Sequence, residues 1–235
     1  MASPRVPSID CSSCQYFSSR TFCHLSPIAL AEYDAIGTII KLPQGAILFR
    51  EDDAGDRVFV LCSGHVKLSC ASRVGRTMNL KIASPGDVLG LSAVISGSCF
   101  EVSAETLEPT FAKVVRRMDF LDFLEHHSEA SLHAAKLLAE EYKSAFSEAR
   151  RMALSGSASG KLASLLLDWG RVAGRGKVEM RFTMALTHDD LASFTATTRE
   201  TVTRALGKFQ RDKLIAIRGN SIHILRPERL AALAA

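Results

Sequence analysis

The 235-residue sequence lacks the features that would place it outside the cytoplasm. No apolar run approaches the roughly 18 residues of a membrane-spanning helix. The first residues do not show the basic, apolar and small-residue order of a secretory signal peptide. A cytoplasmic protein without a membrane partner is therefore expected. In that compartment the six cysteines stay mostly reduced, which argues against a disulfide framework.

The sequence also lacks the motifs of an enzyme. It has no nucleophile–base motif, no glycine-rich loop that would cradle a phosphate, and no His/Asp triad for a catalytic metal. Its composition is that of a globular protein, with 47% hydrophobic and 23% charged residues. We expect a binding or regulatory protein.

Charge is unevenly distributed along the chain. From Lys161 to the C-terminus there are thirteen Lys or Arg and seven Asp or Glu, so this third carries +6 and residues 1–160 carry −2. A basic surface attracts a polyanion, most simply nucleic acid, although such a surface can also be inert.

Residues 39–115 alternate short apolar stretches with glycine-containing turns. The apolar stretches are "AILF", "RVFVLC", "HVKLSC", "TMNLKI" and "FAKVV". Strands at roughly ten-residue spacing with glycine between them are typical of a small β-barrel or sandwich.

A long helix is expected next, because neither Pro nor Gly interrupts residues 128–154. Its 27 residues would span about 40 Å, longer than a small barrel needs. The alternative is a helix packed on its own domain. Heptad spacing favours a two-chain coiled coil, and hence a homodimer, with a seam made of Ala135, Leu138, Tyr142, Ala145, Ala149 and Met152.

The stretch "SGSASG" (residues 155–160) is typical of a hinge. An amphipathic helix and a strand are expected after it, and then two short helices joined by a tight turn. Thr187, with Asp190 three residues on, is a cap for the first short helix, and Thr198 caps the second. This is the pattern of a helix-turn-helix. The hairpin "LIAIRGNSIHIL" after it reads as a wing.

The second short helix begins with residues that can read base edges. Arginine can give two hydrogen bonds to guanine, and a carboxylate can accept one from cytosine. The alternative for Glu200 and Arg204 is an ordinary surface pair at i, i+4. The capped frame and the basic domain favour DNA contacts from Thr198, Arg199, Glu200, Thr203, Arg204 and Lys208.

The glycine-punctuated roll "AGDRVFVLCSGHVKLSC…GRTMNLKIASPGDVLG" and the helix "TRETVTRAL" resemble the CRP/FNR family of bacterial transcription regulators. The resemblance implies an α+β fold, with a cyclic-nucleotide-binding-type β-roll, a long dimerisation helix and a C-terminal winged helix-turn-helix. It implies double-stranded DNA as partner, read as an inverted repeat of TGTGA-like half-sites, and RNA polymerase as a further partner. The expected parts are a Cys-rich arm (1–25), a sensor roll (26–127), the dimerisation helix (128–154), a hinge (155–160) and the DNA-binding domain (161–235).

Three positions depart from the family pattern. Many members carry Gly where Ala196 stands, and alanine should be tolerated there. Cyclic-nucleotide binders have a Glu after the Gly at position 90 and an Arg for the phosphate near position 101. Here Leu91 and Glu101 occupy those places, and a carboxylate would repel a cyclic phosphate, so no cyclic nucleotide is expected.

The arm carries Cys11, Cys14 and Cys23, which resemble the cluster-binding arm of the FNR branch. Thiolates at such spacing can hold an iron–sulfur cluster or zinc, and free redox thiols are the third reading. The second spacing is longer than in the FNR branch, and that branch's fourth ligand falls on Lys113. Cys99, in a Gly/Ser loop, is favoured as the fourth ligand here over Cys62, Cys70 and His24.

These features predict a DNA-binding regulator that responds to redox state, oxygen or nitric oxide through a metal centre. The alternatives are an effector-responsive regulator with structural zinc or free thiols, and a regulatory module that acts on a protein partner.

Overall fold

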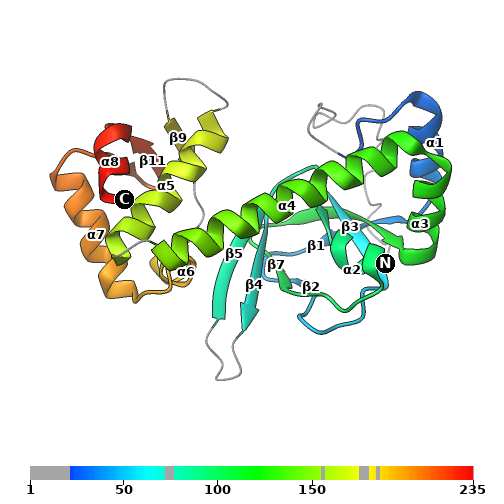
Figure 1. Cartoon of the computed structure of the whole chain (residues 1–235), viewed down its shortest axis with the longest axis horizontal. Coiled ribbons are helices and arrows are strands. Elements are labelled where there is room, and N and C mark those ends of the chain that lie inside the picture. Colours follow the sequence, from blue (N-terminus) through cyan, green and yellow to red (C-terminus); the bar gives the residue numbers. More distant parts are fainter. Residues whose placement is uncertain (1–21, 72–76, 155–156, 175–179, 184–185, 235) are drawn as a thin grey trace, which may run out of the picture. The chain divides into compact units, whose positions relative to one another are not determined.

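The computed structural model describes residues 22–71, 77–154, 157–174, 180–183 and 186–234. Figure 1 shows a mixed α+β chain. Its contacts divide it into two compact units, and the division falls within the long helix, after Lys143, rather than at the expected hinge; residues 77–79 are grouped with the C-terminal unit. None of the described helices is both long and apolar enough to cross a membrane.

The N-terminal unit is a roll of two antiparallel four-stranded sheets. The strand orders are β1-β8-β3-β6 and β2-β7-β4-β5. Its elements are α1 (Pro27–Ala35), β1 (Thr38–Leu42), β2 (Ile47–Phe49), β3 (Arg57–Ser63), β4 (Val66–Ala71), β5 (Thr77–Ala83), β6 (Val88–Leu89), α2 (Leu91–Ser96), β7 (Ser103–Thr106), β8 (Thr110–Arg116) and α3 (Arg117–His126). The apolar stretches of the sequence supply the buried strand positions.

Two apolar clusters stabilise this unit. One is built on Phe49, Phe59 and Phe100, and the rings of Phe49 and Phe100 stack with centroids 4.0 Å apart. The other lies where α1 and α3 pack on the roll, and includes Tyr33 and Phe120. Burying such aromatic rings is a dominant favourable contribution to folding.

The expected arm of residues 1–25 is too long by several residues. Phe22 is fully buried, with its ring centroid 5.6 Å from that of Tyr33 and 5.5 Å from that of Phe120. Leu25 is also buried. The polar sequence around Phe22 hid this core residue, because its partners lie far along the chain.

Helix α4 runs from Ser128 to Leu154, the stretch without Pro or Gly. Leu138 packs against the core of the N-terminal unit, so it does not belong to an exposed seam. The large side chains that α4 exposes include Leu132, Tyr142 and Phe146. Heptad spacing from Leu132 therefore defines a shifted stripe, called the α4 stripe below: Leu132, Ala135, Ala139, Tyr142, Phe146 and Ala149. Ala145 is exposed beside it, and the side chain of Met152 lies outside the described residues.

The C-terminal unit packs helices on a small antiparallel sheet of order β10-β11-β9. Its elements after α4 are α5 (Ala158–Gly174), β9 (Met180–Thr183), α6 (His188–Phe194), α7 (Arg199–Arg211), β10 (Ile215–Arg218), β11 (Ser221–Ile224) and α8 (Pro227–Ala234). The ring of Trp169 contacts those of Phe182 and Phe194 edge-on, which ties α5 to β9 and α6.

The expected hinge at 155–160 is partly helical. Helix α5 begins at Ala158, and the Ser157 hydroxyl accepts a hydrogen bond from the Gly160 amide at 3.0 Å. A side chain at Gly160 would meet the main-chain oxygen of Leu233 at 2.7 Å, so this glycine permits α8 to approach α5 closely. Residues 155–156 lie outside the described residues.

Candidate nucleic-acid interface

Two capped helices form the centre of the C-terminal unit. The Thr187 hydroxyl accepts from the Asp190 amide, and the Asp190 carboxylate accepts from the Thr187 amide, which completes a capping box for α6. The Thr198 hydroxyl accepts from the Thr201 amide at the start of α7. These local bonds satisfy main-chain donors that each helix start would otherwise leave free.

The turn between the helices places Ala196 in the left-handed region, with φ of 48°. The turn thus forms with alanine, as expected, although a side chain at positive φ costs roughly 1–2 kcal/mol relative to glycine. The turn is held by the hydrogen bond from the Thr197 amide to the Ala192 carbonyl, at 2.9 Å.

Helix α7 divides sharply into an apolar and a polar face. Val202, Ala205, Leu206 and Phe209 are buried against the unit. All six expected DNA-contacting residues are exposed: Thr198, Arg199, Glu200, Thr203, Arg204 and Lys208. The structure therefore brings the predicted set together on the solvent face of a single rigid helix.

The charged groups at the start of α7 are held by neighbours within the motif. The Arg199 guanidinium lies 3.6 Å from the Asp189 carboxylate of α6. The Arg204 guanidinium donates to the Thr201 hydroxyl at 3.4 Å. A hydrogen bond from its own main-chain amide, followed by one from Thr198, lowers the pKa of the Glu200 carboxyl, which keeps this acceptor ionised.

Thr203 has a second role that the sequence did not indicate. Its hydroxyl donates to the Arg199 carbonyl at 2.9 Å, so His188 Nδ1, also at 2.9 Å, must be the donor to the same oxygen. The donor of Thr203 is thus used within the protein, and only an acceptor lone pair and the methyl group are left for a base. His188 and Asp189 were missed because their role depends on contacts between α6 and α7.

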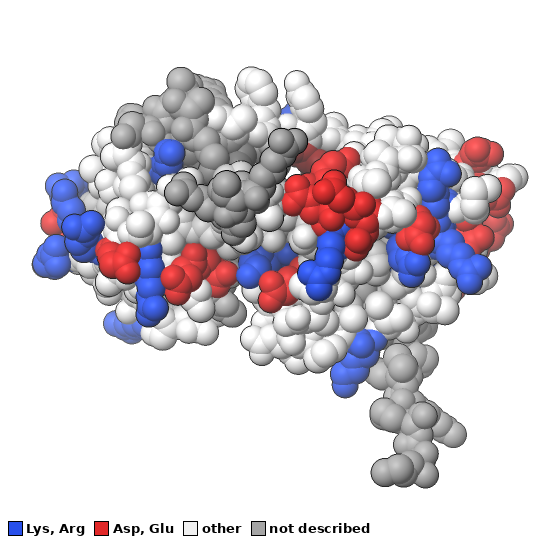
Figure 2. All heavy atoms as spheres, turned by 90° about the horizontal axis from the view of Figure 1, so that it is seen from below, with Lys and Arg blue, Asp and Glu red and all other residues white. Residues whose placement is uncertain are grey.

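A hairpin follows α7. Strands β10 and β11 pair from Ile215↔Ile224 to Arg218↔Ser221, and Gly219 turns the chain with φ of 55°. Figure 2 shows one face of the C-terminal unit, on the left of the picture, and on this face basic and acidic side chains are interspersed.

Comparison with known protein families decides what this motif is. A Crp-like helix-turn-helix domain matches residues 160–233, and a cyclic nucleotide-binding domain matches residues 39–127. The chain is a DNA-binding transcription regulator of the CRP/FNR type. The regulator's two matched segments include the described roll and the capped helices.

Several curated relatives match the regulator over nearly its whole length. The transcriptional activatory protein AadR of Rhodopseudomonas palustris is 28% identical over 95% of this chain and 96% of its own. The CRP-like cAMP-activated global transcriptional regulator of Mycobacterium tuberculosis is 27% identical over 89% of this chain and 94% of its own. The solved structure of FixK2 from Bradyrhizobium japonicum has a TM-score of 0.75 at 22% identity, covering 85% of this chain and 98% of that one. The curated relatives are regulators, not enzymes, in agreement with the missing catalytic motifs.

Leu91 and Glu101 stand at the two positions where the family resemblance implies contacts to a cyclic nucleotide. The Leu91 side chain is buried in the core and offers no hydrogen bond to a ribose. The Glu101 carboxylate accepts from the Ser92 hydroxyl at 2.9 Å, where a phosphate would need a cation. Both observations support the expectation that no cyclic nucleotide binds here.

The predicted metal ligands are only partly described. Cys11 and Cys14 lie outside the described residues. Cys23 is half-buried and packs against the core beneath α1, whereas Cys99 is exposed and forms an isolated bridge with Ala54. Within the described ranges, no three His, Cys, Asp or Glu side chains gather as a metal site would require.

Lys113, at the position where the resemblance places the FNR branch's fourth ligand, is a buried cation. Lys113 is only 2% exposed, and its Nζ donates to the main-chain oxygen of Asp34 at 3.0 Å. The same ammonium lies 4.6 Å from the centroid of the Tyr33 ring. A positive charge held here opposes a metal ion at this position, so the described residues do not fit a cluster bound in the way of that branch.

Proposed function

We propose that the regulator reads an inverted repeat of TGTGA-like half-sites as a homodimer. The observation that carries this proposal is the exposed row of Arg199, Glu200 and Arg204 at the start of α7, above a buried apolar face. The N-terminal residues of a recognition helix contact base edges in the major groove. Two such helices about 34 Å apart match successive major grooves on one side of the DNA.

A randomised-site selection tests the reading. The wild-type protein should recover TGTGA-like half-sites, and Arg204→Ala should lose the preference at one base pair, worth about 1–3 kcal/mol. Lys208→Ala is the matched control, because a phosphate contact weakens all sequences alike and reduces the salt dependence. Recovery of a TTGAT-type half-site, or of no preference, would contradict the proposal that Arg199, Glu200 and Arg204 read the bases.

The dimer is proposed to form along the α4 stripe. The exposed Tyr142 and Phe146 support it, since large exposed apolar side chains in a row mark an interface. An effector event in the roll or the arm would shift the population between two dimer arrangements and so change the spacing of the recognition helices. RNA polymerase is the proposed partner at the promoter, and the cytoplasm the proposed location.

For the signal, we propose that Cys11, Cys14 and Cys23 form a redox-responsive centre. Two observations support this proposal: the three thiols lie within thirteen residues of sequence before α1, and Cys23 is half-buried against the core of the N-terminal unit. An iron–sulfur cluster or zinc fits the spacing of these thiols, with Cys99 as the proposed fourth ligand because its side chain is exposed. Because the buried ammonium of Lys113 opposes a metal ion at its position, we expect any such centre to differ from that of the FNR branch.

Anaerobic purification followed by absorption spectroscopy and Fe, S and Zn analysis tests the centre. A cluster predicts a brown protein that bleaches in air, and Ser at any one of the three arm cysteines should abolish the colour. One zinc per chain without colour would make the arm structural. A metal-free protein with unchanged DNA binding after thiol reduction and oxidation would remove the arm from sensing.

A further inference from the structure

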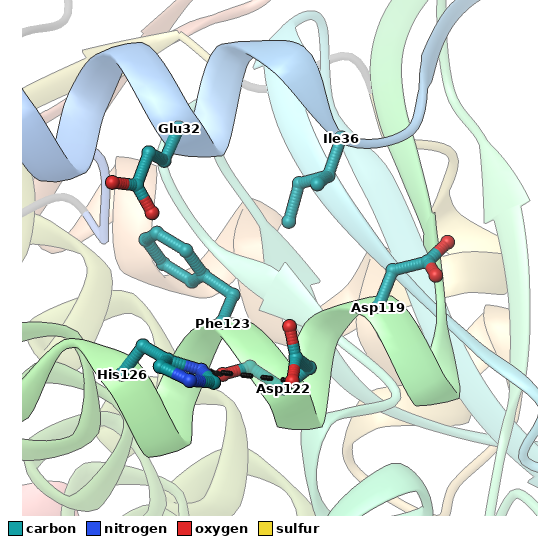
Figure 3. A pocket seen from close by; sticks show the side chains of 6 residues that line it. All are labelled: Glu32, Ile36, Asp119, Asp122, Phe123 and His126. Atoms are coloured by element: carbon teal, nitrogen blue, oxygen red, sulfur yellow. Dashed lines mark hydrogen bonds and ion pairs between the residues drawn. The ribbon is translucent and has the colours of Figure 1, made fainter.

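A groove between α1 and α3 in the N-terminal unit is not used by the DNA-reading function. Its hollow of about 250 Å³ is lined by Glu32, Ile36, Asp119, Asp122, Phe123 and His126. Figure 3 shows Glu32 of α1 and Ile36, which directly follows α1, projecting toward α3, and Phe123 projecting from α3 into the space between the two helices. The groove therefore has walls from two helices and an aromatic ring at its base.

Two exposed apolar side chains share the helix faces that line the hollow. Ile28 precedes Glu32 by four residues and so lies on the same face of α1. Met118 precedes Asp122 by four residues on α3. Ile28 is 73% exposed and Met118 is 72% exposed, among the most exposed of the large apolar residues in the described part of the chain. Such side chains at the edge of a groove mark a protein contact surface.

The groove is acidic. Three of its six lining residues are carboxylates and none is Lys or Arg. Glu32 also lies 2.8 Å from His127 Nε2, and the His126 ring nitrogen bonds the Asp122 carbonyl at 2.8 Å, so both neighbouring imidazoles are held in place. An apolar base with a negative rim is complementary to a segment with apolar anchors and flanking Lys or Arg.

We propose that the α1–α3 groove binds a basic amphipathic helix of another protein. Apolar side chains at i, i+3 or i+4 would pack on Phe123 and Ile36, and flanking cations would pair with Glu32, Asp119 and Asp122. Nucleic acid is excluded because its phosphates would meet carboxylates. A second copy that offered the same groove would also bring like charges together.

The full-length protein can be tested with a fluorescent peptide, LKKLLKLLKKLLKL, whose helix has Leu on one face and Lys on the other. Fluorescence anisotropy at physiological salt should show saturable binding, and the acidic counterpart LEELLELLEELLEL should not bind. Asp119→Lys with Asp122→Lys should weaken binding about tenfold or more, since like charges then face the peptide. Ile28→Ser with Met118→Ser should weaken it as well, without removing core residues.

The matched control is Asp212→Lys with Glu228→Lys, which changes the net charge equally at exposed positions of the C-terminal unit. It should bind the basic peptide as the wild type does. Equal weakening by both charge reversals would reduce the effect to net charge and overturn the proposal, as would no binding by the wild type. Groove-dependent self-association in sedimentation would assign the groove to a second copy instead. Retained DNA binding by the groove variants separates this test from that of the DNA-reading function.

Discussion

The ammonium of Lys113 on β8 lies 3.0 Å from the main-chain oxygen of Asp34, in the last turn of α1. It also lies 3.4 Å from the Asp34 carboxylate, which is half-exposed. A cation in this place both satisfies a carbonyl that the helix end leaves free and complements the helix dipole. Strand β8 thereby holds α1, and with it the segment that begins at Phe22.

Replacing Lys113 by Met should destabilise the protein by about 1–2 kcal/mol, because the charged hydrogen bond is lost while the volume is kept. Asp34→Asn is the contrast: it removes only a half-exposed ion pair, and should cost less than about 1 kcal/mol. Urea denaturation of the two variants measures the difference. A Lys113→Met protein as stable as the wild type would show that the burial cost of the ammonium cancels its bonds.

Ala196→Gly should stabilise the helix-turn-helix. The left-handed conformation costs alanine roughly 1–2 kcal/mol, and glycine would remove this cost. Glycine also makes the unfolded chain more flexible, which offsets about 0.5–1 kcal/mol of the stabilisation. A net gain of up to about 1 kcal/mol is expected in thermal denaturation. Ala205→Gly, in the helical interior of α7, is the control and should lose about 1 kcal/mol. Equal losses in both variants would contradict the strain at the turn.

Tyr142→Glu with Phe146→Glu should give monomers that bind DNA weakly. Both side chains are exposed in the single chain, so the fold should survive, but a dimer along the α4 stripe would bury four new charges. Light scattering after size exclusion measures the mass. Ser144→Glu with Ser147→Glu adds the same charge on the other side of α4 and should remain dimeric. A dimer in the first variant would place the interface elsewhere.

Glu141→Gln should raise stability at neutral pH but not at acidic pH. Burial raises the pKa of the Glu141 carboxyl, Asp87 and Glu101 raise it further, and Lys81 partly opposes them. The folded state thus favours the protonated form. The stability contributed by this group is present below the unfolded pKa and is lost as pH rises through the higher folded pKa.

Melting curves between pH 5 and pH 8 measure this effect. The Glu141→Gln variant should gain about 1–3 °C at pH 8, since 1 kcal/mol shifts the melting temperature of a protein this size by roughly 2–4 °C. The gain should shrink toward pH 5. Glu140→Gln, an exposed neighbour, is the control and should show no such trend. A gain that is constant with pH would point to packing and not to ionisation.

The capped helices and the wing follow from the sequence because their signals are local. Thr187, Asp190 and Thr198 act on main-chain groups three residues away, and Gly219 turns a hairpin whose strands are adjacent in the chain. The polar face of α7 follows for the same reason, since helical periodicity separates Arg199 and Arg204 from the apolar positions.

Other features depend on residues brought together from distant parts of the chain. Phe22 is core only because Tyr33 and Phe120 surround it, and Lys113 is buried only because α1 lies over β8.

The exposed stripe on α4 also depends on contacts between distant parts of the chain. Alternating steps of three and four residues fit two overlapping stripes that share Ala135, Tyr142 and Ala149, and the periodicity alone does not choose between them. Packing of Leu138 against the roll selects the stripe with Phe146, because one side of the helix is already covered by its own core.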